Sequence, residues 1–246
     1  MECLKNFNWV QYLSNNPDLV NAGITTSSKA WKHFVKFGKK EGRSYYEIQP
    51  SKVLTLSSIS GTRHKITIIT PCSRPYNLKK IYDTLKFEFI NKWIIVYDES
   101  KVKKEFLFEE HLQIDEYYHK GEGISGNPQR NYALDLNLDG YIYFLDDDNL
   151  IHPDLYKLLD NTLDIKIYTF SQVRTYGKLV GNYINGGEID TAMILVHSSF
   201  IKNIKWKIDE YGADFYFIKE IIEKNKENWI FINNIVCYYN GIFKKL

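Results

Sequence analysis

The chain has few cysteines and no apolar stretch long enough to cross a membrane. Its three cysteines, Cys3, Cys72 and Cys237, lie far apart and form no CxxC or Cys/His spacing. The sequence therefore predicts neither a zinc site nor a disulfide framework, and a reducing compartment suits it best. The N-terminus also lacks the apolar core of a signal peptide. We expect a soluble, cytoplasmic protein without a membrane span, although a chain that had lost an anchor segment would look the same.

An excess of either charge is also missing. The chain has 32 basic and 30 acidic residues, with a formal net charge of +2. This balance gives no reason to expect a nucleic-acid partner. At 246 residues, with 44% hydrophobic and 25% charged residues, the chain can bury a substantial core as one domain, or as one domain with a small appendage.

Glycine-rich nucleotide motifs are absent as well. The sequence contains no GxGxxG and no GxxxxGK[ST], which disfavours a Rossmann dinucleotide site and a P-loop. Residues 70–75 (TPCSRP) instead join the first predicted strand to a predicted helix. The free N–H groups at a helix N-terminus suit an anionic ligand, but an ordinary turn also explains this segment.

The pattern of apolar residues divides the chain into three parts. Residues 1–48 show helical spacing, with a cap at Ser27 or Ser28 and an end near Gly38, and predict a small helical module. Residues 49–64 are rich in serine and predict a linker. Residues 65–246 alternate strands with helices. This alternation predicts an α/β domain whose mainly parallel sheet is covered on both faces, with antiparallel additions late in the chain.

The elements expected in the third part follow from its periodicity. Strands are predicted near 66–70, 93–97, 112–118, 141–145, 165–170, 178–183, 192–196 and 229–238. Helices are predicted near 75–86, 128–136, 153–159 and 213–224.

An acidic run follows the predicted strand at 141–145. Asp146, Asp147 and Asp148 stand side by side before Asn149, and three like charges at a strand end repel one another. Hard divalent cations prefer carboxylate oxygen, so Mn²⁺ or Mg²⁺ is the natural counter-ion. Open α/β sheets also bind ligands beyond the carboxyl ends of their strands. The alternative is a solvated acidic turn before the helix that starts near Pro153.

Two further polar residues lie next to predicted strands or loops. Asp98 ends the second strand, where a carboxylate can accept a hydrogen bond from a base or a ribose; it can also simply cap a turn. Arg130 begins a helix after a glycine-rich loop. Its side chain is well shaped for a diphosphate, although a surface arginine on an amphipathic helix is an equally ordinary reading.

Two acidic segments lie later in the chain. Gly187 lies in a Gly-Gly pair that lets the backbone approach a ligand, and Glu188 and Asp190 could contact sugar hydroxyls; a simple β-turn explains the glycines equally well. Asp214 begins the last predicted helix and could act as a general base. An aspartate at a helix N-terminus is also favoured by the helix dipole alone.

Taken in order, these segments resemble the GT-A glycosyltransferases, in particular the β1,3-glucuronyltransferase family and the broader family 2. The resemblance extends over about residues 65–239. It rests on the segments ITIITP followed by Arg74, WIIV followed by Asp98, QRN around Arg130, YFLDDDN at 143–149, and Asp190 before Ala-Met. It implies a GT-A fold for the third part of the chain.

The resemblance also implies roles by position. Residues implied around the nucleotide are Thr70, Pro71, Arg74, Asp98, Arg130, Asp146 and Asp147. The implied metal ligands are Asp148 and Asp146, and the implied sugar contacts are Gly187, Glu188 and Asp190. Asp214 matches the catalytic carboxylate, although these families usually have Glu or Glu-Asp there and Ala213 precedes it here. The last strand carries CYYN at 237–240 where many relatives have histidine, so glucuronate specificity does not transfer.

The function implied is transfer of a sugar from a nucleotide-diphosphate donor, a UDP-sugar, to an acceptor hydroxyl, with Mn²⁺ or Mg²⁺ as cofactor. The acceptor would be a glycan, a protein or a lipid-linked molecule, and an inverting reaction would use an aspartate base. A sugar-phosphate nucleotidyltransferase and a non-catalytic carbohydrate-binding protein are the alternatives.

Residues 1–48 are similar to a helical module found beside glycosyltransferase domains in bacteria and giant viruses. The shared pattern is YLxxNPD, then HF, then GxxEGR. A docking or packing role, including self-association into a homo-oligomer, is the expectation for this module. A viral source would place the protein in the host cytoplasm.

Overall fold

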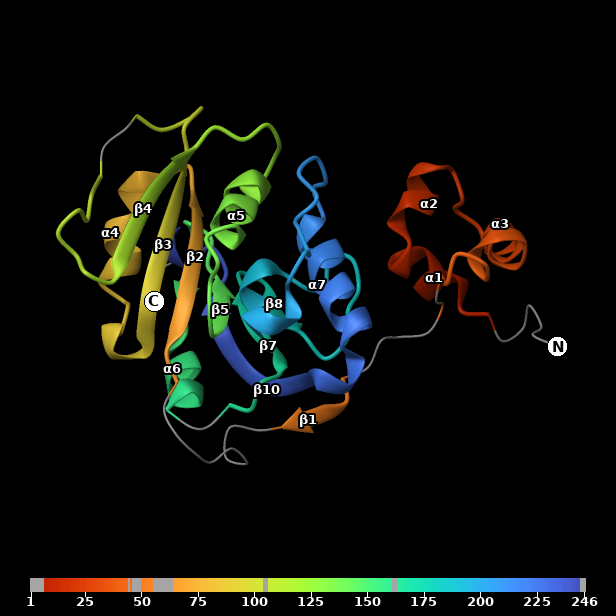
Figure 1. The fold of residues 1–246 in the computed structure, drawn as a ribbon. Coiled ribbons are helices and arrows are strands. Elements are labelled where there is room, and N and C mark those ends of the chain that lie inside the picture. Colours follow the sequence, from red (N-terminus) through yellow and green to blue (C-terminus); the bar gives the residue numbers. More distant parts are fainter. Residues whose placement is uncertain are drawn as a thin grey trace.

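The computed structural model describes residues 7–43, 45, 50–54, 64–103, 106–160 and 163–243. Within this part of the chain, ten strands form one sheet. Figure 1 shows the sheet flanked by helices, with three short helices of the N-terminal region to one side. The strands are β1 (Lys52–Leu54), β2 (Ile66–Cys72), β3 (Ile90–Asp98), β4 (Ile114–His119), β5 (Tyr141–Phe144), β6 (Leu150–Ile151), β7 (Ile167–Arg174), β8 (Gly177–Val180), β9 (Ile194–His197) and β10 (Trp229–Tyr238).

The sheet is mainly parallel. Its strand order is β1-β10-β7-β9-β5-β2-β3-β4, with β6 paired to β10 and β8 paired to β7. Along the main path β9 runs antiparallel to both neighbours, and the other pairs are parallel. The predicted fold class is therefore confirmed, including antiparallel strands late in the chain. The reversal at β9 brings its N-terminal end to the edge where the parallel strands have their C-terminal ends.

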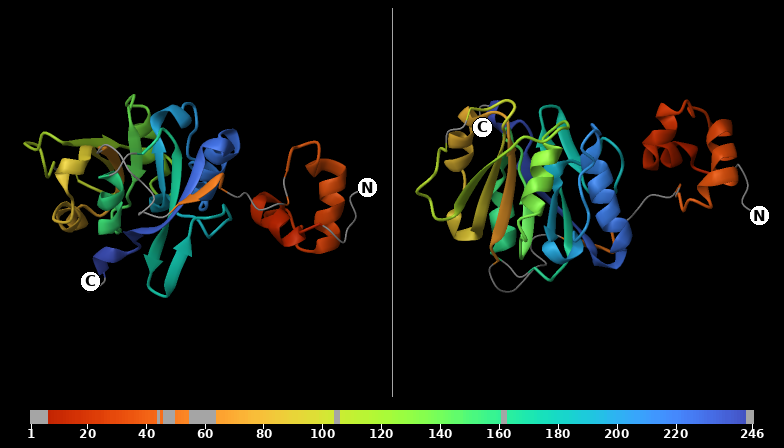
Figure 2. Two further views of the ribbon diagram at one scale, coloured as in Figure 1. Left: turned by 90° about the horizontal axis from the view of Figure 1, so that it is seen from below. Right: turned by 45° about the horizontal axis from the view of Figure 1, so that its top comes forward.

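Side chains that alternate along the central strands form two cores, one on each face of the sheet. In β5, Tyr141 and Tyr143 point into one core, and Ile142 and Phe144 into the other. The first core is covered by α4 (Leu78–Tyr82) and α6 (Pro153–Leu159), and the second by α5 (Asn127–Leu134) and α7 (Ala213–Lys224). Figure 2 shows these layers from two further sides.

Most predicted elements are present with shifted ends. The helix predicted at 75–86 is shorter: a 3₁₀ turn at Pro75–Asn77 leads into α4, which ends at Tyr82. The strand predicted at 165–170 extends to Arg174, so its last residues reach the edge of the sheet. The predicted linker at 49–64 includes β1, which pairs in parallel with β10; residues 55–63 lie outside the described part.

The N-terminal region forms the predicted helices around its own small core. They are α1 (Trp9–Asn15), α2 (Pro17–Asn21) and α3 (Ser27–His33), and a π-helical turn follows at Phe34–Gly38. The cap of α3 is Thr26 rather than Ser27 or Ser28. The helical run ends at Gly38, as predicted, with Lys39 as the C-cap residue. A Cβ at Gly38 would lie 2.2 Å from the Tyr12 hydroxyl oxygen, so close packing against α1 explains this glycine.

The three N-terminal helices lie beside the α7 side of the sheet (Figures 1 and 2). Gln11 of α1 donates a hydrogen bond from Nε2 to Asn185 Oδ1 at 2.5 Å. Asn185 in turn donates to Glu188. The module therefore contacts the loop that leads to Asp190.

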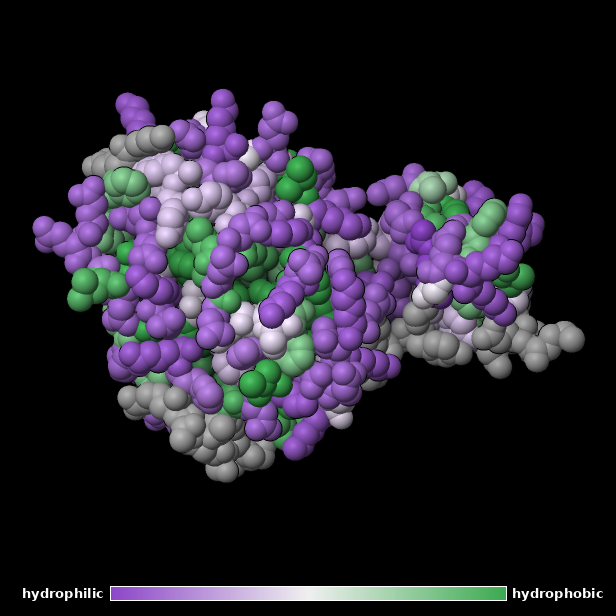
Figure 3. All heavy atoms as spheres, in the orientation of Figure 1, coloured by the Kyte–Doolittle hydropathy of each residue, from purple (hydrophilic) through white to green (hydrophobic). Residues whose placement is uncertain are grey.

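None of the helices described is long and apolar enough to cross a bilayer. On the face drawn in Figure 3, hydrophilic residues cover most of the surface, and hydrophobic residues appear in separate patches.

Candidate active site

Strand direction gathers distant residues at one edge of the sheet. β2, β3 and β5 are parallel, so Asp98 at the end of β3 lies at the same edge as Arg74 and Asp146, which follow β2 and β5. β7 runs the same way as β5 and ends there with Arg174, whereas antiparallel β9 begins there just after Asp190. Ligands of α/β sheets bind beyond the carboxyl ends of parallel strands. A ligand site is therefore expected at this edge.

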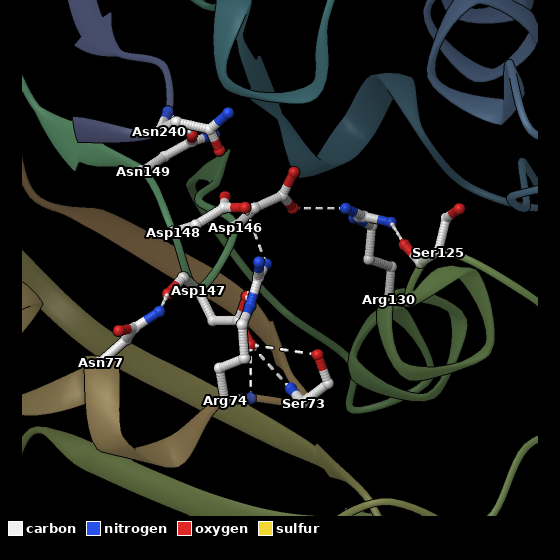
Figure 4. Close-up of polar contacts among 10 residues, drawn as sticks. All are labelled: Ser73, Arg74, Asn77, Ser125, Arg130, Asp146, Asp147, Asp148, Asn149 and Asn240. Atoms are coloured by element: carbon white, nitrogen blue, oxygen red, sulfur yellow. Dashed lines mark hydrogen bonds and ion pairs between the residues drawn. The ribbon is translucent and has the colours of Figure 1, made fainter. Parts of the chain in front are cut away.

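The acidic turn after β5 is held by an arginine and by backbone groups (Figure 4). Asp147 Oδ2 accepts the backbone N–H groups of Ser73 and Arg74 at 2.7 and 2.8 Å. Its Oδ1 accepts Arg74 Nε at 2.9 Å and also contacts Arg74 Nη2. Asn77 donates from its side chain to the Asp147 carbonyl oxygen at 2.9 Å. With 3% of its side chain exposed, Asp147 ties the turn after β5 to the turn after β2.

Asp146 and Asp148 each pair with a different arginine. Asp148 Oδ2 lies 2.8 Å from Arg74 Nη2, and Asp146 pairs with Arg130 Nη2. Burial is the main cause that raises the pKa of both carboxyl groups. The charges of Asp190 and Asp148 further raise the pKa of Asp146, and the charge of Asp147 raises that of Asp148. The arginines oppose this effect, so the turn already carries two counter-ions of its own.

Arg130 is nearly buried and fixed from several sides. Its Nη1 donates to the Ser125 carbonyl oxygen at 2.7 Å and to Asn127 Oδ1 at 3.0 Å. Its guanidinium carbon lies 4.7 Å from the centre of the Trp206 ring. These contacts hold the guanidinium behind Asp146, facing the two cavities described next.

A cavity of about 230 Å³, here called the Asp148 cavity, opens over the acidic turn. Its lining includes Pro71, Arg74, Asp98, Lys101, Gly126, Arg130, Asp146, Asp148 and Tyr239. Lys101 Nζ lies 3.0 Å from Asp98 Oδ2. Acidic and basic side chains thus line one cavity. Such a lining suits a polar, anionic ligand accompanied by a metal cation.

The carboxylates of the Asp148 cavity are the available donors for a divalent ion. Among the residues that the structure describes, no group of three or more His, Cys, Asp or Glu side chains is arranged to hold a metal. Asp146 and Asp148 nevertheless supply hard oxygen donors to the same cavity. Mg²⁺ commonly takes only one or two carboxylates and completes its coordination with substrate phosphates and water. The pair therefore fits an ion that binds together with a diphosphate.

A second cavity of about 370 Å³, the Asp214 cavity, adjoins the first. Both are lined by Ser125, Arg130, Asp146 and Tyr239. The second also includes Arg174, Gly187, Asp190, Trp206, Tyr211 and Asp214. Burial and the nearby charge of Asp190 raise the pKa of Asp214 to about 7. A carboxylate with a pKa near neutral pH can accept a proton from a bound hydroxyl.

The carboxylate of Asp190 is held in place by three hydrogen bonds from its neighbours. Its Oδ2 accepts Gln172 Nε2 and Arg174 Nη2, each at 2.8 Å, and its Oδ1 accepts the Thr191 N–H at 2.7 Å. Arg174 also lies over the ring of Tyr239, 4.6 Å from its centre. Asp190 is therefore a fixed, paired carboxylate next to Asp214.

Ten of the twelve residues predicted for the site line one of these two cavities. Those ten are Pro71, Arg74, Asp98, Arg130, Asp146, Asp147, Asp148, Gly187, Asp190 and Asp214. Thr70 is fully buried and its hydroxyl accepts Trp93 Nε1 at 2.9 Å, so it lies in the core below the site. Glu188 is exposed and bonds to Asn185; it is not among the residues that line either cavity.

Sequence reasoning missed Arg174, Tyr239 and Trp206. The sequence does point to Arg174, because the polar residues Ser171 and Gln172 lie in the otherwise buried, apolar strand that ends at Arg174. Polar residues inside such a strand indicate a nearby site. Tyr239 stands in the CYYN segment after β10. Trp206 lies in an irregular segment and contacts Arg130 only through the tertiary fold.

Solved structures resemble this chain at low sequence identity. S. aureus TarS 1-349 matches with a TM-score of 0.53 and 12% identity, over 71% of this chain and 60% of that one. The same TarS segment in complex with UDP-GlcNAc gives 0.48 and 12% identity, over 71% and 58%. Glucosyl-3-phosphoglycerate synthase from Mycobacterium tuberculosis, in complex with Mn²⁺, UDP and glucosyl-3-phosphoglycerate, gives 0.49 and 9% identity, over 72% of each chain.

This chain has a GT-A fold.

No protein-family model and no curated protein sequence matches it. The likeness to TarS establishes the GT-A fold alone.

Proposed function

We propose that this chain is a metal-dependent glycosyltransferase that moves a sugar from a UDP-sugar to an acceptor hydroxyl. The observation that carries the proposal is the pair of adjoining cavities that meet at Asp146. The Asp148 cavity has the charges that a nucleotide diphosphate needs. The Asp214 cavity has two carboxylates suited to sugar hydroxyls, one of them with a pKa near 7. The GT-A fold agrees with this division of the site.

In the proposed reaction, Asp214 accepts the proton of the acceptor hydroxyl, and the hydroxyl oxygen forms a bond to the anomeric carbon. The bond from that carbon to the diphosphate oxygen breaks, and its electron pair leaves with UDP. This is an inverting displacement. Arg74 and Arg130 lie where their positive charge would stabilise the negative charge on the leaving diphosphate. A divalent ion held by Asp148, Asp146 and the diphosphate would supply further neutralising charge.

Turnover of UDP-sugars tests the proposal. UDP-GlcNAc and UDP-glucose are tried first, because TarS is known in complex with UDP-GlcNAc and the glucosyl-3-phosphoglycerate synthase in complex with UDP and its glucosyl product. UDP release is measured with Mn²⁺ and with EDTA, for the natural chain and for Asp214→Asn. Asp209→Asn is the matched control, since Asp209 is exposed and outside both cavities. We expect release that needs Mn²⁺ and falls by about 100-fold or more in Asp214→Asn. Release that is unchanged by EDTA and by Asp214→Asn contradicts the proposal.

Two further assays distinguish a glycosyltransferase from the two alternatives, a sugar-phosphate nucleotidyltransferase and a non-catalytic carbohydrate-binding protein. A nucleotidyltransferase would release pyrophosphate from a nucleoside triphosphate and a sugar phosphate. A non-catalytic binder would hold sugars without Mn²⁺-dependent binding of UDP.

A further inference from the structure

Arg74 occupies a position between two carboxylates of the acidic turn. Its Nε lies 2.9 Å from Asp147 Oδ1, and its Nη2 lies 2.8 Å from Asp148 Oδ2 and also contacts Asp147. In Figure 4 the guanidinium lies alongside the turn, between the two side chains. A single arginine thus neutralises both Asp147, which the sequence implied as a nucleotide contact, and Asp148, which it implied as a metal ligand.

The two contacts differ in how firmly they are held. Asp147 is 3% exposed and is fixed by two backbone N–H groups as well as by the guanidinium. Asp148 is 16% exposed and faces the cavity, and Arg74 itself is 34% exposed. The Asp147 end is therefore an anchor. The Asp148 end is the part of the pair that a ligand in the cavity can reach.

The charges of the turn favour replacement of Arg74 by a divalent cation at Asp148 when a diphosphate is also bound. The three carboxylates and the two arginines, Arg74 and Arg130, leave the turn with one negative charge. A divalent cation that binds alone must compete with Arg74 for Asp148. A diphosphate that binds with the cation offers the guanidinium a new partner of suitable shape, because arginine binds phosphate oxygens in a two-pronged geometry. The competition is then relieved.

We propose that Arg74 is an exchangeable counter-ion: it holds Asp148 in the free protein and moves its outer nitrogens to the diphosphate when nucleotide and divalent cation bind together. Asp147 keeps the Nε end in place and is a positioning residue rather than a metal ligand. This inference rests on the proposed function, because it takes a nucleotide diphosphate as the ligand. Its consequence is positive coupling, in which UDP strengthens Mn²⁺ binding and Mn²⁺ strengthens UDP binding by the same factor.

The test measures binding and needs no turnover. Mn²⁺ is titrated into the full chain and free Mn²⁺ is followed by electron paramagnetic resonance, with and without saturating UDP. In the natural chain we expect UDP to tighten Mn²⁺ binding by about tenfold or more. In Arg74→Gln, Mn²⁺ alone should bind about tenfold tighter than in the natural chain, and UDP should change that affinity by less than about threefold.

Lys79→Gln is the matched control. It also removes a positive charge, from the helix that follows Asn77, but Lys79 is 72% exposed, pairs with Asp83 at 2.6 Å and lines neither cavity. We expect it to keep the coupling of the natural chain. If Lys79→Gln behaves like Arg74→Gln, general electrostatics explain the effect and the exchange is refuted.

Other outcomes separate this inference from the proposed function. If the natural chain binds Mn²⁺ with UDP but Arg74→Gln does not bind Mn²⁺ alone more tightly, the exchange is refuted and the function stands. If the natural chain binds no Mn²⁺ even with UDP, both fail. Should Arg74→Gln not fold, Arg74→Lys decides the matter. It keeps the charge but has a single nitrogen, so it cannot hold Asp147 through Nε and Asp148 through Nη2 as arginine does. Mn²⁺ alone should therefore still bind more tightly than in the natural chain, and an unchanged affinity refutes the exchange.

Discussion

Replacing Asp214 with asparagine should make the protein more stable at pH 8 while it removes the proposed activity. Burial and the nearby Asp190 carboxylate raise the pKa of Asp214 from an ordinary value of 3.8 to about 7. Above pH 7 the folded protein must therefore hold a buried negative charge near other carboxylates. Asparagine removes that charge, and its side-chain oxygen can still accept the Phe215 N–H that Asp214 accepts at 2.8 Å.

The sign and size follow from proton linkage. Between pH 4 and pH 7 the folded state keeps the Asp214 proton and the unfolded state has lost it, so stability falls as pH rises through this window. Each unit of pKa difference is worth about 1.4 kcal/mol, which sets an upper limit of about 4 kcal/mol for the whole window. Partial contact with solvent reduces this value, so we expect about 2 to 4 kcal/mol.

Urea unfolding at pH 4.5 and pH 8, without nucleotide or metal, measures the effect. Asp214→Asn should match the natural chain at pH 4.5 and exceed its free energy of unfolding at pH 8. Asp209→Asn, at an exposed position, should show the pH dependence of the natural chain. If Asp214→Asn and the natural chain have the same pH dependence, the carboxyl group does not titrate near 7 and the argument for it as a general base fails.

Three further predictions concern the acidic turn, its glycine neighbour and the reaction. Asp147→Asn should lower the free energy of unfolding by about 3 kcal/mol, because it breaks a buried pair, whereas Asp148→Asn should change it by less than about 1 kcal/mol; equal losses in urea unfolding would contradict this. Gly126→Ala should cost about 1 to 3 kcal/mol and weaken UDP binding, because Gly126 has φ +74° and a Cβ would lie 2.6 Å from Pro71 Cβ; a thermal melt and a UDP titration that both match the natural chain would refute it. Finally, kcat/KM for UDP-sugar transfer should rise with pH up to about 7 and then level, because Asp214 must lose its proton to act as a base; a profile that is flat from pH 5 to 8 would exclude that role.

The sequence was most informative where a local pattern has one physical solution. The apolar run at 141–145 is buried on both sides because helices cover both faces of the sheet at this central strand, and α7 spans the residues predicted for it. Arg174 and Tyr239 escaped attention for the opposite reason. Each is an ordinary residue at the end of a strand, and its place beside Asp190 depends on which strands are neighbours.

The acidic run illustrates the limit of local reasoning. Three adjacent aspartates indicated a cation but did not distinguish their roles. In the folded chain Asp147 is buried against the turn after β2, Asp148 faces a cavity, and Asp146 pairs with Arg130 on α5. Their partners are 16 to 74 residues away in the sequence. Pairing over such separations is decided by the packing of strands and helices.

By itself, then, the sequence determined the alternating strands and helices, the acidic strand end and the candidate base, because hydrophobic periodicity and clustered charge are local properties. Only the tertiary structure decided which carboxylate is an anchor, which ones face a ligand, and which arginines accompany them. The physical reason is strand direction. Parallel β2, β3, β5 and β7 bring their C-terminal ends to one edge, and the reversed β9 adds Asp190 from its N-terminal end.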